Sequence, residues 1–264
     1  MAASRGTLAS RAVDAPATFA KGLIGDAGKS PAEAEWSTLH DGRSILLMRH
    51  LLSEKECLAL MDASEAAGFE HAGLSSKVRG CERVVVEAPD IAQRLWERSE
   101  AHVCGEDSPF AELDISEDEA PDFGSGSGGR WKPVGLNSRF RSCRYGPRGH
   151  FAPHCDGWLE IPGTEHRTFL TFMVYLNDVP EDRRGATRFF RFPTSSDPPL
   201  HVDTPDGLIT GSDAYVTCKV QPEAGMAVVF KQAVVLHDGE PLASGSKSIF
   251  RSDVVFDAVP SAHE

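Results

Sequence analysis

His154 and Asp156 stand two positions apart, and both side chains are of types that bind metals. On an extended strand, residues i and i+2 point to the same side, so this imidazole and this carboxylate could reach one ion. Such a pair is common by chance, but His237 strengthens it because an apolar run (VVL) that predicts a buried strand leads directly to it. Two histidines and one carboxylate on one face of a metal are typical of non-heme Fe(II) oxygenases, since they leave the other positions open.

Zinc is the main alternative metal, because a set of two histidines and a carboxylate also forms catalytic zinc sites. In those sites the two histidines usually stand in the motif HExxH on a helix. The chain contains no HExxH. The spacing of the three candidate ligands therefore favours iron.

Two cations follow His237 in the segment GSKSIFRSDVVF: Lys247 ten residues later and Arg251 four residues beyond it. If this segment is a strand, Lys247, Ile249 and Arg251 share one face. Cations that point into a β-barrel are costly unless an anion meets them, and a dicarboxylic acid would do so. The alternative is that this face of the strand is turned to solvent.

Composition limits the class of protein and its partners. The chain has 264 residues, of which 41% are hydrophobic, enough for one sizeable core. Its net charge of -12 disfavours nucleic acid as a partner and mildly favours neutral or basic peptides. No apolar run approaches the roughly 18 residues that a membrane-spanning helix needs, so no membrane partner is expected. Six scattered cysteines without CxxC pairs favour free thiols and a cytoplasmic location.

The first half of the chain divides into three regions. Residues 1–35, rich in Ala, Ser and Gly, predict a disordered tail, which is favoured over an organellar transit peptide. Residues 36–105 predict a helical support region, with a strand at Arg43–Met48 and helices beginning at Ser53 and Pro89. Residues 106–130 are acidic and then Gly- and Ser-rich, which predicts a mobile loop.

From residue 131 to 258 the sequence changes to short β-rich runs separated by Gly, Pro and Asp. This spacing is typical of an all-β sandwich or barrel, with residues 193–213 as an insertion between two strands. The clearest predicted strands are Thr168–Leu176, Ala186–Phe192, Met226–Phe230 and Ser248–Phe256.

An ordered set of motifs in residues 137–257 resembles the prolyl 4-hydroxylase-type Fe(II)/2-oxoglutarate-dependent dioxygenase family. The set is a Tyr nine residues before the first His, the HxD pair, the strand LTFMVYLN, a Gly-x-Thr-x-Phe strand, and a distal His followed ten residues later by Lys. The resemblance implies a mainly β fold with N-terminal helices, in which a double-stranded β-helix (a cupin-like jelly roll) carries Fe(II) on His154, Asp156 and His237.

The same resemblance implies the cosubstrates and their ligands. 2-Oxoglutarate and O2 would bind beside the metal, with Lys247 holding the distal carboxylate of 2-oxoglutarate. Tyr145, Thr171 and Tyr175 match the positions that hydrogen-bond this cosubstrate, and Arg251 is a second cation and an alternative anchor. Ascorbate dependence is also expected from the family.

The implied reaction is hydroxylation of a C–H bond, coupled to decarboxylation of 2-oxoglutarate to succinate and CO2. The substrate expected from the family is a peptidyl-prolyl or other amino-acid side chain, and a small molecule is the alternative. Trp158 directly follows the HxD segment, while Asn137 and Arg139 point the same way on a predicted strand, so these three are candidates for the substrate pocket. The alternatives are packing at the rim for Trp158 and a polar surface for the other two.

Two other functions stay open. The first is a jelly roll that has lost its chemistry and serves as a binding module, and the second is a cupin-like metal hydrolase or isomerase, which would leave Lys247 and Arg251 without a role. The remaining polar residues near the motifs are expected at the surface: His150, His166 and His201 in loops, and Asp238 in a solvent-facing turn.

Overall fold

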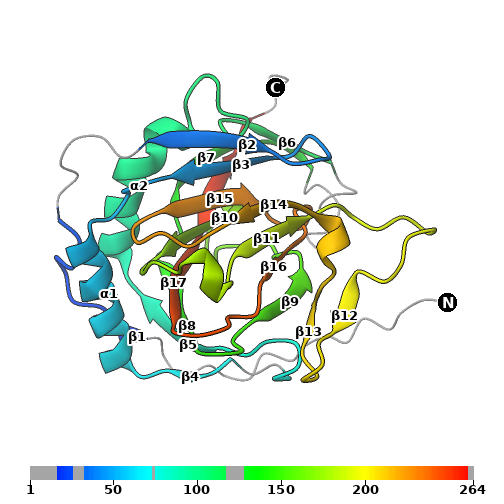
Figure 1. Ribbon diagram of the computed structural model, residues 1–264. Helices are drawn as coiled ribbons and strands as arrows, with labels where there is room; N and C mark the ends of the chain where they lie inside the picture. The colour runs from blue at the N-terminus through cyan, green and yellow to red at the C-terminus, as the bar shows by residue number, and fades with distance from the viewer. Residues whose placement is uncertain (1–16, 26–32, 73–74, 117–127, 261–264) are drawn as a thin grey trace.

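The computed structural model describes residues 17–25, 33–72, 75–116 and 128–260, and within these ranges the chain forms two facing β-sheets (Figure 1). The larger sheet has the strand order β1-β5-β8-β17-β10-β15-β3-β2, with β4, β6 and β7 added beside this path. Its strands are Ala17–Thr18 (β1), Ala34–Thr38 (β2), Ser44–Met48 (β3), Glu70–His71 (β4), Glu82–Glu87 (β5), Leu113–Ile115 (β6), Gly129–Leu136 (β7), Arg139–Tyr145 (β8), Arg167–Tyr175 (β10), Ala227–Lys231 (β15) and Lys247–Ala258 (β17).

The smaller sheet has the order β14-β11-β16-β9, and a separate hairpin joins β12 to β13. These strands are Phe151–His154 (β9), Thr187–Phe190 (β11), His201–Asp203 (β12), Ile209–Gly211 (β13), Val216–Val220 (β14) and His237–Gly239 (β16). Short 3-10 turns occupy Glu181–Arg183 and Asp213–Tyr215. All pairs in both large sheets are antiparallel except β1 with β5.

The β17 strand is the centre of the larger sheet, because it pairs with β10 along one edge and with β7 and β8 along the other. Its residues 247–256 are buried apart from the half-buried Arg251. A strand covered on both faces can carry consecutive apolar residues, which explains the run VVF near its end.

Two α-helices in the described ranges cover the outer face of the larger sheet (Figure 1). The α1 helix, Glu54–Ala67, begins at a capping box in which Ser53 and Glu56 satisfy each other's backbone N–H groups, and Gly68 ends it. The α2 helix, Pro89–Val103, begins with Pro, whose missing N–H costs nothing in the first turn. Both helices begin where the sequence predicts.

Two apolar clusters lie on the two faces of the larger sheet. The outer cluster joins the helices to outward side chains of the strands, such as Leu46, Phe172 and Phe250. The inner cluster lies between the two sheets and contains their neighbours on the same strands, such as Leu47, Met173 and Ile249. The alternation follows from the two-residue period of a strand.

The predicted fold class, a mainly β jelly roll with N-terminal helices, is confirmed. The four predicted long strands correspond to β10, β11, β15 and β17. The predicted insertion at residues 193–213 lies between β11 and β14 and contains the β12–β13 hairpin. The division at residue 131 stays a prediction, since strands β3 and β5 of the helical support region are hydrogen-bonded into the larger sheet.

The structure differs from the sequence prediction in two segments. Part of the predicted tail is ordered, because β1 pairs with β5, and Phe19 and Ile24 are buried in the outer cluster. Part of the predicted loop at 106–130 is also ordered, since β6 pairs with β7. Residues 1–16 and 117–127, to which the rest of these predictions apply, lie outside the described ranges.

Candidate metal and cosubstrate site

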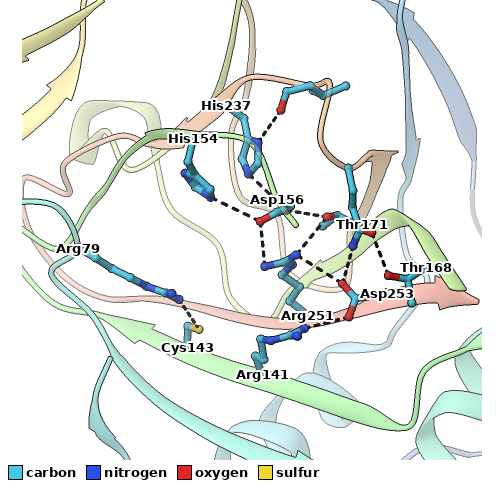
Figure 2. A network of polar contacts seen from close by, with 12 residues as sticks. Arg79, Arg141, Cys143, His154, Asp156, Thr168, Thr171, His237, Arg251 and Asp253 are labelled. Atoms are coloured by element: carbon cyan, nitrogen blue, oxygen red, sulfur yellow. Dashed lines mark hydrogen bonds and ion pairs between the residues drawn. The ribbon is translucent and has the colours of Figure 1, made fainter. Parts of the chain in front are cut away.

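The three predicted metal ligands meet at the smaller sheet. His154 ends β9 and His237 begins β16, and the antiparallel pairing of these strands places the two residues directly opposite each other. Asp156 follows His154 by two residues, just beyond the end of β9. Their ligand atoms all lie within 4.8 Å of one another. Figure 2 shows the two rings and the carboxylate turned toward one point.

The spacing of these donor atoms fits one metal ion. Nε2 of His154 lies 3.5 Å from Oδ1 of Asp156, and Nε2 of His237 lies 3.6 Å from Oδ2. Donors about 2.1 Å from a shared ion lie roughly 3.0–3.5 Å apart for angles between about 90° and 109°. Two imidazoles and one carboxylate form the facial set associated with Fe(II), so the donor chemistry fits that ion.

Backbone carbonyls orient both imidazole rings. The Nδ1–H of His154 donates to the Ala152 carbonyl at 2.8 Å, and that of His237 donates to the Val235 carbonyl at 3.0 Å. Because a carbonyl only accepts, the proton of each neutral ring is on Nδ1 and the lone pair is on Nε2. Burial, together with the neighbouring His154, lowers the pKa of His237 to about 3, so this ring is neutral near pH 7.

Asp156 is a buried carboxylate held on both oxygens. Thr171 donates its hydroxyl to Oδ2 at 2.6 Å, and Arg251 lies 3.0 Å from Oδ1. Burial opposes ionisation, but Arg251 and the two histidines outweigh it, so the pKa of Asp156 lies well below its usual range. The carboxylate is therefore charged and fixed in orientation before any metal arrives.

Arg251 is itself part of a buried network (Figure 2). Its guanidinium also lies 3.4 Å from Asp253, which accepts from Arg141 at 3.0 Å and from Gln232 at 2.7 Å. Lys247, Ile249 and Arg251 do share the inner face of β17, as predicted, but the structure places Arg251 on the metal-binding carboxylate.

Lys247 is a buried cation at another point of the same cavity. Its ammonium donates to the Gly185 carbonyl at 2.8 Å and lies about 5.5 Å from the ring centres of Tyr145 and Tyr175. Burial lowers its pKa to about 8, although the charges of Asp238 and Glu240 partly oppose this, and no carboxylate of the described residues forms an ion pair with it. A side chain in this state gains most from an incoming anion.

Gly185 is needed for this contact. Its φ of 76° lies in the left-handed region, and a Cβ there would stand 2.7 Å from a methyl group of Leu242. The Gly-x-Thr-x-Phe motif therefore places both a carbonyl for Lys247 and the Thr187 side chain in the cavity. Thr187 accepts the hydroxyl proton of Tyr175 at 2.7 Å.

One cavity is lined by the three metal ligands and by Lys247, Tyr145 and Thr171. Trp158, Asn137 and Arg139 lie outside this lining. The Trp158 ring packs edge-on against Phe169, with ring centres 5.3 Å apart, at the side of the outer cluster. Asn137 accepts the backbone N–H of Arg139 at 3.1 Å.

Two predicted surface residues are buried. Asp238 is 1% exposed and forms an ion pair with Arg188, which is also 1% exposed and further contacts Asp213 at 2.8 Å. His150 is 1% exposed, and its two ring nitrogens contact the backbone carbonyls of Arg148 and Lys77. Both predictions were wrong because a turn-like sequence context does not show which loops another sheet covers.

Arg79 and Phe151 also line the cavity, and sequence reasoning missed both as site residues. The Arg79 guanidinium lies 4.4 Å from the centre of the Phe151 ring, and that ring stacks on His154 at 3.7 Å. Arg79 stands 75 residues before His154, and no periodic pattern in the sequence links the two. Only the backbone bridge between Arg79 and Phe151 brings them together.

Comparison with known proteins shows a family that part of this chain resembles. Residues 140–252 match the model of the 2OG-Fe(II) oxygenase superfamily, a segment that contains all three metal ligands, Lys247 and Arg251. The matched segment of this chain is therefore similar to the 2OG-Fe(II) oxygenase superfamily, whose members use Fe(II), 2-oxoglutarate and O2. In the comparison with curated proteins, no sequence matched.

Solved structures of prolyl hydroxylases are among those that match this chain. The viral collagen prolyl hydroxylase of Paramecium bursaria Chlorella virus-1, solved with 2-oxoglutarate, is 19% identical with a TM-score of 0.48, over 83% of this chain and 98% of that one. A prolyl-4-hydroxylase of Pseudomonas putida is 17% identical with a TM-score of 0.48, over 81% and 94%. A prolyl hydroxylase of Trichoplax adhaerens, solved with a hypoxia inducible factor peptide, is 13% identical with a TM-score of 0.47, over 80% and 83%.

Among the residues that the structure describes, no helix is both long and apolar enough to cross a membrane.

Proposed function

We propose that this enzyme hydroxylates a C–H bond of a peptidyl-prolyl or other amino-acid side chain, while 2-oxoglutarate is converted to succinate and CO2. One observation carries the proposal: His154, Asp156 and His237 converge in a cavity that also holds Lys247, which is buried and forms no ion pair with a carboxylate of the described residues. A metal site alone would suit many reactions. A second anchor for a dicarboxylate in the same cavity favours this one.

In this proposal His154, Asp156 and His237 hold Fe(II). When bound, Fe(II) with 2-oxoglutarate and O2 supplies the oxidant that hydroxylates the substrate. The protein fixes both Nε2 lone pairs through the carbonyl contacts of the rings and keeps Asp156 charged through Arg251 and Thr171. Its own contribution is therefore geometry and charge, set before the ligands bind.

Lys247 holds the distal carboxylate of 2-oxoglutarate, and Tyr145 and Tyr175 flank it. Both tyrosines are buried, and burial raises the pKa of each hydroxyl, so both remain neutral donors. Thr171 and Arg251 act on Asp156 in this structure, which supports a role in orienting the metal ligand. Lys247 is thus favoured over Arg251 as the anchor, because Arg251 is already engaged by Asp156 and Asp253.

The substrate enters over the rim of the cavity. The segment at 193–213 is proposed to shape that rim, whereas Trp158, Arg139 and Asn137 lie outside the cavity lining and are not proposed as substrate contacts. Ascorbate as a reductant remains part of the proposal on the strength of the family resemblance. The six free cysteines support a cytoplasmic location.

The test is anaerobic addition of Fe(II) and 2-oxoglutarate to the metal-free protein. The expected result is the weak visible charge-transfer band of a 2-oxoglutarate complex, saturating at one equivalent of each. If the folded protein shows no band, the proposal is contradicted. A jelly roll without chemistry and a metal hydrolase are both expected to give no band. Succinate as the matched control lacks the keto oxygen and should give no band.

A further inference from the structure

Three arginines gather at one side of the cavity: Arg79 and Arg141 line it, and Arg83 lies beside Cys143 just outside the lining. Arg141 is on β8 and Arg83 on β5, and the register of these strands places Arg83 opposite Cys143 and Arg141 opposite Val85, so the two arginines are diagonal neighbours on one face. Arg79 precedes β5, and its guanidinium lies 3.4 Å from Cys143. Figure 2 shows Arg79 extended toward Cys143, with Arg141 nearby.

The charges of this group are incompletely matched by the protein. Arg141 has a carboxylate partner, Asp253, at 3.0 Å. Among the described residues, no carboxylate forms an ion pair with Arg79 or Arg83. Burial lowers the pKa of Arg83, and repulsion from Arg79 and Arg141 lowers it further. Like charges held together in a partly buried place are costly unless an anion meets them.

A thiolate can offset only part of this excess. Arg79 donates its Nε–H to Cys81 at 3.1 Å. A hydrogen bond from Cys143, together with the charge of Arg79, lowers the pKa of Cys81 to about 6. An ionised Cys81 would balance Arg79 alone, and although Glu70 of β4 is the cross-strand neighbour of Arg83, the two form no ion pair among the described residues.

The cofactors of the proposed reaction do not supply the missing anion. Fe(II) carries two positive charges and 2-oxoglutarate two negative ones, so the pair is neutral. Its distal carboxylate is assigned to Lys247, while Arg251 is matched by Asp156 and Asp253. The arginine group is therefore left for a third partner.

We propose that Arg79, Arg83 and Arg141 form an anion subsite that binds a carboxylate of the peptide substrate, on an Asp or Glu close to the hydroxylated residue. The proposal rests on the proposed function and adds the chemical class of its substrate. Guanidinium groups bind carboxylates with paired hydrogen bonds, and Arg79 is separated from the metal ligand His154 only by the Phe151 ring. The positive charge of the three arginines therefore favours acidic peptides, in contrast to the net charge of -12, from which neutral or basic peptides are expected.

The test uses the full chain, loaded anaerobically with Fe(II) and 2-oxoglutarate and immobilised, and a synthetic library of peptides with a central proline and all residue types at the flanking positions. Retained peptides are sequenced by mass spectrometry, and the ratio of Asp and Glu to Asn and Gln is compared with that of the input. We expect about tenfold enrichment of the acids, the usual effect of a charge-assisted hydrogen bond. The amides serve as neutral controls of matched shape.

Two variants locate the preference, Arg83→Gln and Arg79→Gln, each of which removes one guanidinium and keeps a polar side chain. Both should reduce the enrichment severalfold. Arg148→Gln is the matched control, because Arg148 is exposed and paired with Asp206, away from the three arginines of the proposed subsite. Circular dichroism checks that each variant is folded.

The outcomes separate the two proposals. If the wild-type protein gives the charge-transfer band but retains acids and amides equally, or retains no peptide, the anion subsite is overturned while the oxygenase assignment stands. Enrichment that survives in both variants also overturns it. Absence of the band in the wild-type protein overturns the proposed function itself.

Discussion

Two regions beside the metal ligands, called here the matched wall and the unmatched wall, treat buried cations in opposite ways. On the smaller sheet, Arg188 is completely buried yet matched by Asp238 and Asp213. On the other side, Lys247 of β17, Arg83 of β5 and Arg79, which precedes β5, have no carboxylate partner among the described residues, whereas Arg141 and Arg251 of the larger sheet are paired. The paired charges of the matched wall stabilise the fold and the position of the metal ligands. The unpaired cations of the unmatched wall favour the binding of anions. Substitutions on the first wall should therefore affect stability and the metal, and those on the second should affect ligand binding.

The largest effect is expected at the metal-binding carboxylate. Asp156→Ala removes one of three ligands and leaves Arg251 without a partner on that side. The charge-transfer band and succinate formation should both be lost. Asp203→Ala, at an exposed aspartate on β12, is the control and should keep both. A normal band in Asp156→Ala would show that the metal binds elsewhere.

The matched wall should respond with a loss of stability. Arg188→Met leaves Asp238 buried and uncompensated, which typically costs about 3–5 kcal/mol in the free energy of unfolding. Urea unfolding followed by circular dichroism measures this. In Arg148→Met the broken ion pair with Asp206 is exposed, and the expected change is below about 1 kcal/mol. Equal changes in both variants would contradict the contrast between the walls.

The unmatched wall should respond with a loss of cosubstrate affinity. Lys247→Ala removes the proposed anchor for the distal carboxylate, so the 2-oxoglutarate concentration needed for the half-maximal band should rise by about tenfold to a hundredfold. The band at saturation should remain, since the metal ligands are intact. If Lys247→Ala changes nothing while Arg251→Ala weakens binding, Arg251 is the anchor.

The smallest effect is a pH dependence at the same residue. The pKa of Lys247 is lowered to about 8 by burial, so its ammonium is present below that pH and is lost above it. The affinity for 2-oxoglutarate should therefore fall as the pH rises through about 8, approaching tenfold per pH unit. Lys247→Arg stays charged throughout, and anaerobic titrations of the band should show a flatter profile for this variant.

Much of the fold could be predicted because local patterns decide it. Ser53 and Glu56 form the predicted capping box, and Pro89 begins the second helix as expected. The β10 strand lies within one residue of its predicted bounds. The ordering of residues 17–25 could not be predicted, because β1 depends on an edge of β5 that lies about 70 residues away.

The site shows the same division. The three candidate metal ligands could be predicted from the HxD pair and from the ten-residue spacing of His237 and Lys247, although β9 ends at His154 and Asp156 lies just beyond it. The burial of Asp238 could not be predicted, since it depends on Arg188 from another strand. Thr171 was expected to contact the cosubstrate. In the structure its hydroxyl donates to Asp156, because β10 faces the metal ligands.

The sequence alone determined the ligand types, their order and the strand faces that carry them, since a two-residue period and a ten-residue spacing are properties of the chain. The tertiary structure decided which charges are matched. A cation on a strand has the same sequence signature whether it faces a carboxylate or an empty side of a cavity. Only the tertiary structure showed that Arg251 and Arg141 have carboxylate partners and that Arg79 and Arg83 have none among the described residues.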